Sequence, residues 1–182
     1  MRFLQTDRLL LRRFGEGDAE RLIALDADPE VMRFINGGAP TAAEAIRIDI
    51  LPRFLRYHAA YDHFGFFAAE TQGEFIGWFH FRPGRDASLG TELGYRLARA
   101  AWGRGYAVEG GRALLQHGFA HGVRRAIART LVANVRSQRV LEKLGFALQG
   151  EVVEEQFPGS DRRALLYSID RPDPPSPAPN QA

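Results

Sequence analysis

Two glycines separated by one residue, Gly103 and Gly105, stand directly before a segment with the apolar spacing of a helix. Glycine adopts positive φ readily, so successive backbone amides in such a loop can point to the same side. The first amides of a helix also lack acceptors within the helix, and its N-terminus carries a partial positive charge. The stretch AAWGRGYAVEGG (residues 100–111) therefore predicts a loop that binds an anion, usually a phosphate.

Two well-known phosphate-binding loops do not fit these residues. A P-loop requires Gly-Lys followed by Ser or Thr, and the chain has no such sequence. A dinucleotide-binding loop of the form G-x-G-x-x-G starting at Gly103 would need a glycine where Val108 stands. It would also need an acidic residue at the end of the following strand, at a distance that the sequence does not provide. A different phosphate ligand is therefore indicated.

The composition limits the class of protein. The chain has 182 residues, 45% of them hydrophobic and 25% charged, which is typical of a globular domain with a full core. It has no cysteine, which excludes disulfides, thiolate metal sites and a cysteine nucleophile. The net charge of +2 is spread over interspersed basic and acidic residues, so no basic stripe indicates nucleic acid. No apolar run approaches the length of a membrane span and no signal peptide is recognisable, so a cytoplasmic location is expected.

The pattern of apolar residues predicts one mixed α/β domain. Strands are expected at 8–14, 64–70, 74–81, 91–97, 125–134, 147–155 and 163–169, and helices at 16–28, 29–35, 41–61, 106–119 and 137–146. Hairpins come first and a strand–helix–strand crossover follows, so the sheet must combine antiparallel and parallel pairs. We expect a single domain over residues 1–170 and a disordered, proline-rich tail over residues 171–182.

Three separated stretches, at residues 5–35, 92–115 and 132–146, resemble the GNAT superfamily of acetyl-CoA-dependent N-acetyltransferases in family order. More narrowly, they resemble the branch that includes the ribosomal-protein N-terminal acetyltransferases. The resemblance implies a GNAT-type α/β (α+β) fold with a mixed, mostly antiparallel twisted sheet. It further implies helices on both faces of that sheet and a splayed strand pair that holds coenzyme A. It implies no metal.

The resemblance also implies which residues bind coenzyme A. The loop residues Gly103, Arg104, Gly105, Tyr106, Ala107 and Val108 would wrap its pyrophosphate, and the strand residues Tyr95, Arg96 and Leu97 would pair with its pantetheine arm. Asn134, at the end of the next strand, resembles the family asparagine near that arm and the substrate. A turn residue or a helix cap is the alternative interpretation of Asn134.

Attack on a thioester needs a neutral amine, so a base must remove a proton and an acid must protonate the leaving thiolate. Glu92 is the candidate base, acting through water, because a glutamate in E-[apolar]-G-Y recurs in the branch; an exposed glutamate at the strand end is the alternative. Leu141 stands where many family members have a tyrosine acid, so Ser137 becomes the candidate acid, with a helix cap as its alternative. His80 alternates with Trp78 on one strand, and we interpret it as a packed rather than a catalytic histidine. The other four histidines are expected to be peripheral.

These observations predict an enzyme that moves an acetyl group from acetyl-CoA to a primary amine by direct attack in a ternary complex. The alternatives are an enzyme for another acyl-CoA or another acceptor, such as an aminoglycoside or a polyamine, and a non-catalytic CoA-binding module. The expected partner is an amine-bearing small molecule or a protein N-terminus, without nucleic acid or membrane. Both a monomer and a homodimer are compatible with the sequence.

The front segment of the chain bears on the identity of the acceptor amine. The front segment is expected to line the mouth of the site with Phe34, Phe54 and Tyr57, interleaved with Arg33, Arg53 and Arg56. Such a lining would repel a polycation, which needs carboxylates to replace the water around its ammonium groups. An amine on a neutral or acidic body, such as an amino acid or a peptide N-terminus, is therefore favoured.

Overall fold

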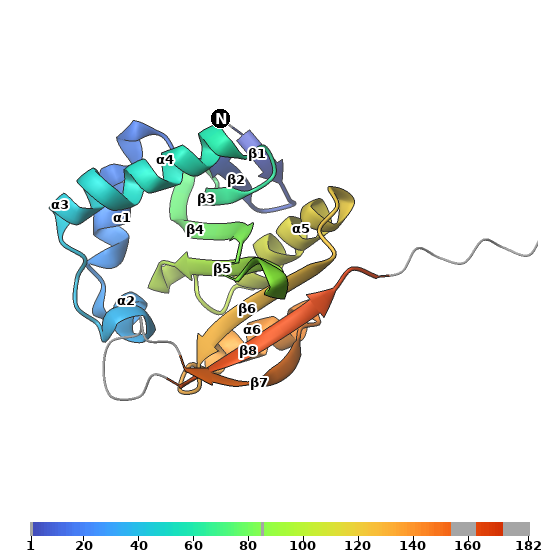
Figure 1. Cartoon of the computed structure of the whole chain (residues 1–182). Coiled ribbons are helices and arrows are strands. Elements are labelled where there is room, and N and C mark those ends of the chain that lie inside the picture. The colour runs from blue at the N-terminus through green and yellow to red at the C-terminus, as the bar shows by residue number, and fades with distance from the viewer. Residues whose placement is uncertain (1, 85, 154–162, 173–182) are drawn as a thin grey trace, which may run out of the picture.

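The computed structural model describes residues 2–84, 86–153 and 163–172, and its centre is one twisted, eight-stranded sheet (Figure 1). The strands are β1 (Arg2–Gln5), β2 (Leu10–Arg13), β3 (Gly65–Thr71), β4 (Glu74–Pro83), β5 (Thr91–Leu97), β6 (Arg125–Leu131), β7 (Ala147–Val153) and β8 (Arg163–Asp170). They are arranged in the order β1-β2-β3-β4-β5-β6-β8-β7. Neighbours are antiparallel except for β5 and β6, which are parallel. The expected mixed, mostly antiparallel sheet is confirmed.

Helices cover both faces of this sheet. They are α1 (Ala19–Asp26), α2 (Pro29–Asn36), α3 (Ala43–Ala45), α4 (Leu51–Ala60), α5 (Tyr106–Ala120) and α6 (Val135–Leu144). In Figure 1, α4 crosses over β2 to β4, while α5 and α6 lie beside β4 to β8. A π-helical turn over Ile46–Ile50 joins α3 to α4 directly before Pro52, where the sequence predicts a kink or division.

Each face of the sheet has its own apolar core, because successive side chains of a strand point to opposite sides. Phe79 and Phe81 of β4 are fully buried against α5 on one face. Trp78 of the same strand packs against Phe54 of α4 on the other face, with ring centroids 5.5 Å apart. Helix α5 approaches the sheet closely: a Cβ on Gly110 would lie 2.5 Å from the Phe79 ring. Glycine at this position therefore permits the close packing of α5 on the sheet.

Some elements differ from those that the sequence predicts. Strand β1 was not predicted; it pairs with β2 at one edge of the sheet. The helix expected from Thr41 begins at Ala43 without a side-chain cap, because the Thr41 hydroxyl donates instead to Oδ2 of Asp26 at 2.7 Å. The sequence also places Asp18 as the cap of the first helix, but Asp18 makes no side-chain capping bond to α1, and its buried carboxylate accepts hydrogen bonds from Arg12 at 2.7 and 2.8 Å.

The feature that shapes the site is the divergence of β5 and β6. The two strands pair only through Thr91 with Ala126 and Glu92 with Ile127. Beyond Glu92, β5 continues to pair with β4 as far as Leu97, and β6 continues to pair with β8. The two strands therefore separate toward their carboxyl ends while each keeps its outer neighbour, which confirms the expected splayed pair.

The division into a domain over residues 1–170 and a tail over residues 171–182 stays a prediction, because most of that tail lies outside the described residues. Arg171, its first residue, still donates its backbone N–H to the Arg124 carbonyl at 2.8 Å. No helix among the described residues has both the length and the apolar character that crossing a membrane requires.

Candidate active site

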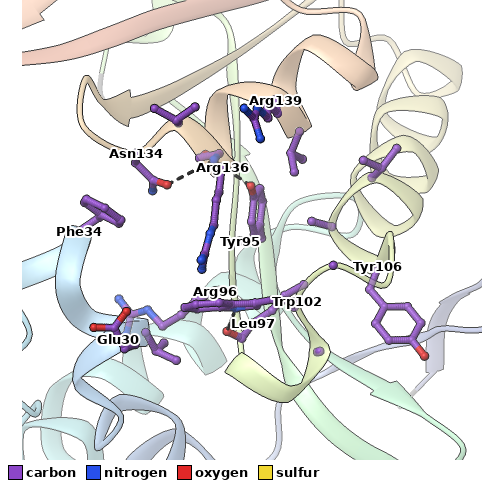
Figure 2. A pocket seen from close by; sticks show the side chains of 18 of the residues that line it. Glu30, Phe34, Tyr95, Arg96, Leu97, Trp102, Tyr106, Asn134, Arg136 and Arg139 are labelled. Atoms are coloured by element: carbon purple, nitrogen blue, oxygen red, sulfur yellow. Dashed lines mark hydrogen bonds between the residues drawn. The ribbon is translucent and has the colours of Figure 1, made fainter.

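A cavity of about 920 Å³ lies at the carboxyl ends of β5 and β6, where these strands have separated. Figure 2 shows its walls, which come from α2, the end of β5, the glycine loop and the start of α6. The predicted site residues that line it are Tyr95, Arg96, Leu97, Gly103, Gly105, Tyr106, Ala107, Val108, Asn134 and Ser137. Arg104 and Glu92 are not among the lining residues. The structure therefore brings the predicted site together except for these two residues.

The glycine loop has the backbone conformation that an anion site requires. Gly103 and Gly105 have φ values of 74° and 82°, in the left-handed region that glycine adopts without a steric cost. Gly105 is the N-cap of α5, and the first backbone hydrogen bond of that helix is donated by Glu109 to the Gly105 carbonyl at 3.0 Å. The amides ahead of Glu109 are consequently free of acceptors within the helix.

Arg8, in the segment between β1 and β2, also supports this loop, and the sequence did not reveal this contact. Arg8 donates from Nη1 to the Arg104 carbonyl at 3.0 Å and from Nε to the Glu109 carboxylate at 2.7 Å. The same guanidinium lies 4.8 Å from the centre of the Tyr106 ring, which Figure 2 shows turned away from the other labelled residues. These contacts fix the loop, while Arg104 itself is exposed and is not among the residues that line the cavity.

Helix α6 adds three cations to the cavity, and the sequence interpretation missed them as site residues. Arg136, Arg139 and Lys143 all line it. Figure 2 shows Arg136 extending toward Trp102, and its Cζ lies 5.1 Å from the Trp102 ring centre. Trp102 is held in turn by a 2.8 Å hydrogen bond from Nε1 to the Leu97 carbonyl. The spacing i, i+3 and i+7 places these cations on one helix face, a signal that the sequence does contain.

Two hydroxyl groups meet inside the cavity. The Tyr95 hydroxyl donates to Oγ of Ser137 at 3.4 Å, and burial raises the pKa of Tyr95. Asn134 caps α6, because its Oδ1 accepts the backbone N–H of Ser137 at 3.2 Å. The alternative interpretation of Ser137 as the cap is therefore wrong, and its hydroxyl is available to Tyr95. Leu141, at the position of the family tyrosine, is buried in the core.

Glu92 lies at the opposite end of β5 from the cavity. Its carboxylate accepts hydrogen bonds from Arg82 at 2.7 Å and from Arg129 at 3.2 Å, and its side chain is 12% exposed. Burial alone would raise the pKa of Glu92, but His80 and the two arginines outweigh it and hold the pKa below its ordinary value. A carboxylate held in this way is a weak proton acceptor, so these contacts weigh against Glu92 as a base, and that role stays a prediction.

His80 is packed in the sheet, as the sequence interpretation favours. It pairs with Gly94 across β4 and β5, and a Cβ on Gly94 would lie 2.6 Å from its ring. Burial is the main cause that lowers the pKa of His80 to about 4. Both ring nitrogens are buried without a hydrogen-bond partner among the described residues. His80 is therefore a neutral imidazole at physiological pH and does not line the cavity.

Comparison with known proteins decides the family. The family model described as an acetyltransferase (GNAT) domain matches residues 8–147. The chain belongs to the GNAT acetyltransferase family. It is an acetyl-CoA-dependent N-acetyltransferase, as its sequence motifs predict.

Individual relatives of this GNAT enzyme cover most of its length. An FsC-acetyl coenzyme A-N(2)-transacetylase of Aspergillus fumigatus is 31% identical over 92% of this chain and 76% of its own. The structure resembles a ribosomal L7/L12 α-N-protein acetyltransferase in complex with coenzyme A, with a TM-score of 0.80, 20% identity, and coverage of 93% and 98% of the two chains. It also resembles the microcin C7 self-immunity acetyltransferase in complex with acetyl-CoA and AMP, with a TM-score of 0.78, 18% identity, and coverage of 91% and 93%.

The mouth of this GNAT cavity differs from the sequence expectation. Arg33 and Phe34 of α2 line the cavity as expected, and Glu30 joins them from the same helix. Phe54 does not: it is only 2% exposed and stacks on Phe66 in the core, with centroids 3.9 Å apart. Three more residues that the sequence places at the mouth do not line the cavity: Arg53, Arg56 and Tyr57. Helix α2, rather than α4, therefore forms the wall of the cavity.

A buried hydrogen-bond network connects the end of β5, at the cavity, to the last residue of α1. The Arg96 guanidinium donates to Oδ1 of Asp26 at 2.5 Å and lies 5.0 Å from the centre of the Trp78 ring. Thr41 donates to the other oxygen of the same carboxylate. Arg96 lines the cavity, but its charge is compensated by the buried Asp26. Its side chain thus has a structural role in addition to its place on the strand.

Proposed function

We propose that this GNAT enzyme binds acetyl-CoA in the cavity between β5 and β6 and transfers its acetyl group directly to a primary amine. The observation that carries the proposal is the meeting of three features in one cavity. These are the left-handed glycine loop at a helix start, the separated strand ends and the cations of α6. Each of them suits a different part of a long, phosphate-bearing thioester.

The residues present fit acetyl-CoA by their chemistry. The free amides at the start of α5 suit the pyrophosphate, since hydrogen bonds to a charged acceptor contribute about 1.5–3 kcal/mol each. Arg136, Arg139 and Lys143 can neutralise further phosphate charge. Beyond Glu92, the described part of β5 has a ladder partner in β4 alone, so its other edge suits the amide groups of the pantetheine arm.

The reaction forms a C–N bond and breaks the C–S bond of the thioester, so the leaving sulfur needs a proton or a hydrogen bond. Ser137 and Tyr95 are the two hydroxyl groups that we assign to this step. Because the raised pKa of Tyr95 keeps its hydroxyl protonated, it can donate through Ser137, its partner at 3.4 Å. Asn134 fixes the backbone that carries Ser137.

The amine must lose a proton, and Glu92 is the residue that we assign to this step. Glu92 lies on the same strand as Tyr95, three residues earlier, and could take the proton through water. Its ion pairs with Arg82 and Arg129 and its lowered pKa count against this role. A rate measurement on the Glu92→Gln enzyme separates a base from a purely structural carboxylate, because only the loss of a base would lower the rate of acetyl transfer.

The acceptor that we propose is an amine on a neutral or acidic body, such as an amino acid or a peptide N-terminus. Among the described residues, the charged groups that line the cavity are one carboxylate, Glu30, and five cations: Arg33, Arg96, Arg136, Arg139 and Lys143. Arg96 is paired with the buried Asp26, and the cations of α6 are assigned to the phosphates of acetyl-CoA, so the cavity offers a polycation only Glu30 to replace the water around its ammonium groups. The names of the relatives support an amine acceptor, because one is an N(2)-transacetylase and another is a ribosomal-protein α-N-acetyltransferase.

The test is thiol release from acetyl-CoA with a panel of amines at equal concentration. We expect a short peptide with a free N-terminus or an amino acid to be acetylated faster than spermidine or kanamycin. Faster turnover of the polycations would overturn the acceptor assignment. The absence of amine-dependent thiol release with every acceptor class would count against the catalytic proposal itself.

A further inference from the structure

Three histidines from two distant parts of the sequence form a cluster outside the cavity. His63 precedes β3, and His117 and His121 lie one turn apart at the end of α5. One ring nitrogen from each of the three lies within 4.8 Å of the others. None of the three lines the cavity between β5 and β6. The cluster is therefore separate from the site proposed for acetyl transfer.

The orientation of His121 is typical of a metal ligand. Its Nδ1 lies 2.7 Å from the His117 carbonyl oxygen, and because a carbonyl can only accept, Nδ1 must carry the proton. This leaves the lone pair on Nε2 available for a cation. Histidine ligands usually donate their other ring N–H to a carbonyl or carboxylate in this way, which fixes the tautomer and the ring orientation.

The other two rings are spaced as two ligands of one ion would be. Nδ1 of His63 lies 3.2 Å from Nε2 of His117. Two nitrogens bound tetrahedrally to Zn²⁺ at about 2.0–2.1 Å lie about 3.3 Å from each other. The His63 and His121 rings are stacked with centroids 3.9 Å apart, and one nitrogen of each ring lies within 4.8 Å of the others, so the rings must turn out of the stack to point at one ion.

The surroundings of the cluster favour a bound cation. His117 is half-buried, with its ring centroid 5.2 Å from that of His63 and 4.2 Å from that of His121. His117 and His121 are also at the C-terminal end of a helix of fifteen residues, whose dipole attracts positive charge. His117 is held from its other side by Phe3, with ring centroids 4.8 Å apart.

We propose that His63, His117 and His121 form a binding site for one divalent transition-metal ion. Three imidazoles without a carboxylate select Zn²⁺, Co²⁺, Ni²⁺ or Cu²⁺ over Mg²⁺ and Ca²⁺, which prefer oxygen ligands. The ion would connect the segment before β3 to the end of α5, and its remaining coordination position would hold water. The sequence implies no metal for the acetyl transfer, and this site serves the fold rather than that reaction.

The test is calorimetric titration of Zn²⁺ into tag-free protein that has been treated with a chelator. We expect one Zn²⁺ per chain. Replacing His121 or His63 by alanine should weaken binding at least about tenfold, while Gln116→Ala, an exposed neighbour on α5, should leave it unchanged. His117 is not chosen, because it packs against Phe3 and its loss could disturb the fold.

The unfolding temperature with and without Zn²⁺ distinguishes loss of the metal site from loss of stability in a variant. Zn²⁺ should raise the unfolding temperature of the wild-type protein and of Gln116→Ala, but not that of His121→Ala or His63→Ala, since a ligand stabilises only the state that binds it. The rate of thiol release should be the same with and without chelator. One Zn²⁺ per two chains, no binding, or equal binding by the wild-type protein and both histidine variants would overturn the proposal.

Discussion

The two ends of β5 lie in different environments. At its start, Thr91 and Glu92 pair with β6, and Glu92 is enclosed by two arginines. At its end, Tyr95 to Leu97 face a cavity of about 920 Å³. A strand of seven residues thus changes from a closed, ion-paired environment to an open one.

This difference teaches how one strand can serve both stability and binding. At the closed end Glu92 is hydrogen-bonded to Arg82 and Arg129, so these groups stabilise the sheet and are not available to a ligand. At the open end β5 loses its parallel neighbour, and the amides of the glycine loop and the hydroxyl groups of Tyr95 and Ser137 face the resulting space. The following changes are designed to test that contrast, beginning with the largest expected effect.

Replacing Gly105 by valine should remove binding at the open end. A β-branched side chain at φ 82° is strained, and it displaces amides that would bind phosphate. Losing two such hydrogen bonds should weaken acetyl-CoA binding by about 100-fold or more, measured by calorimetry. Gly122→Val is the matched control, because Gly122 has φ 91° and no atom within 4 Å of the added Cβ, at the far end of α5. Equal affinity in both variants would contradict the loop assignment.

Replacing Glu92 by glutamine should affect mainly the stability of the closed end. The change removes a buried partner of Arg82 and Arg129, which should lower the free energy of unfolding by about 3 kcal/mol in denaturant titrations. Acetyl-CoA affinity should stay close to that of the wild-type enzyme. If Glu92 is also the base, the rate should fall by about 10²–10⁴ with an altered pH–rate profile. A folded variant with an unchanged profile would remove Glu92 from the mechanism.

His80 gives the region beside the closed end a dependence on pH. The pKa of His80 is about 4 in the folded protein and about 6.5 in the unfolded chain. Between these two values the unfolded state is protonated and the folded state is not, so falling pH favours the unfolded state. Stability should therefore fall from pH 6.5 to pH 4, by up to about 3 kcal/mol for this residue. His80→Gln should lose less stability over that interval, measured by denaturant titration at each pH. A variant with the same pH dependence as the wild type would show that His80 is not the cause.

Removing a single hydroxyl group at the open end should have a smaller effect. Tyr95→Phe and Ser137→Ala should each lower kcat by about tenfold, because a thiolate leaves readily near neutral pH and needs less help from an acid. The double variant should be little slower than the slower single one, since the two hydroxyls form one pair. Additive losses in kcat would mean that the two groups act at separate steps.

The sequence predicted the parts of the molecule that depend on local chemistry. The bounds of β5 follow from the run TELGYRL, and the glycine loop follows from the rarity of positive φ in other residues. The π-helical turn before Pro52 lies where the sequence predicts a kink. These features are determined by neighbours in the chain, so they can be inferred without knowledge of the fold.

What the sequence did not predict depends on contacts between distant residues. Thr41 is three residues before Glu44, as in a capping box, yet it donates to Asp26 because α1 lies beside it in the fold. Glu92 has the family position of a base, but Arg129, 37 residues later, occupies its carboxylate. The placement of α2 rather than α4 at the cavity is a matter of packing of the same kind. No pattern along the chain encodes these choices.

The central claim is that acetyl-CoA binds at the open end of β5 and not at the closed one. Amide hydrogen exchange with and without acetyl-CoA tests it residue by residue. We predict increased protection of the amides from Gly103 to Val108 and of the last residues of β5, with Thr91 and Glu92 unchanged. Protection confined to other segments, with the exchange of the glycine loop unaltered at saturating acetyl-CoA, would contradict the account.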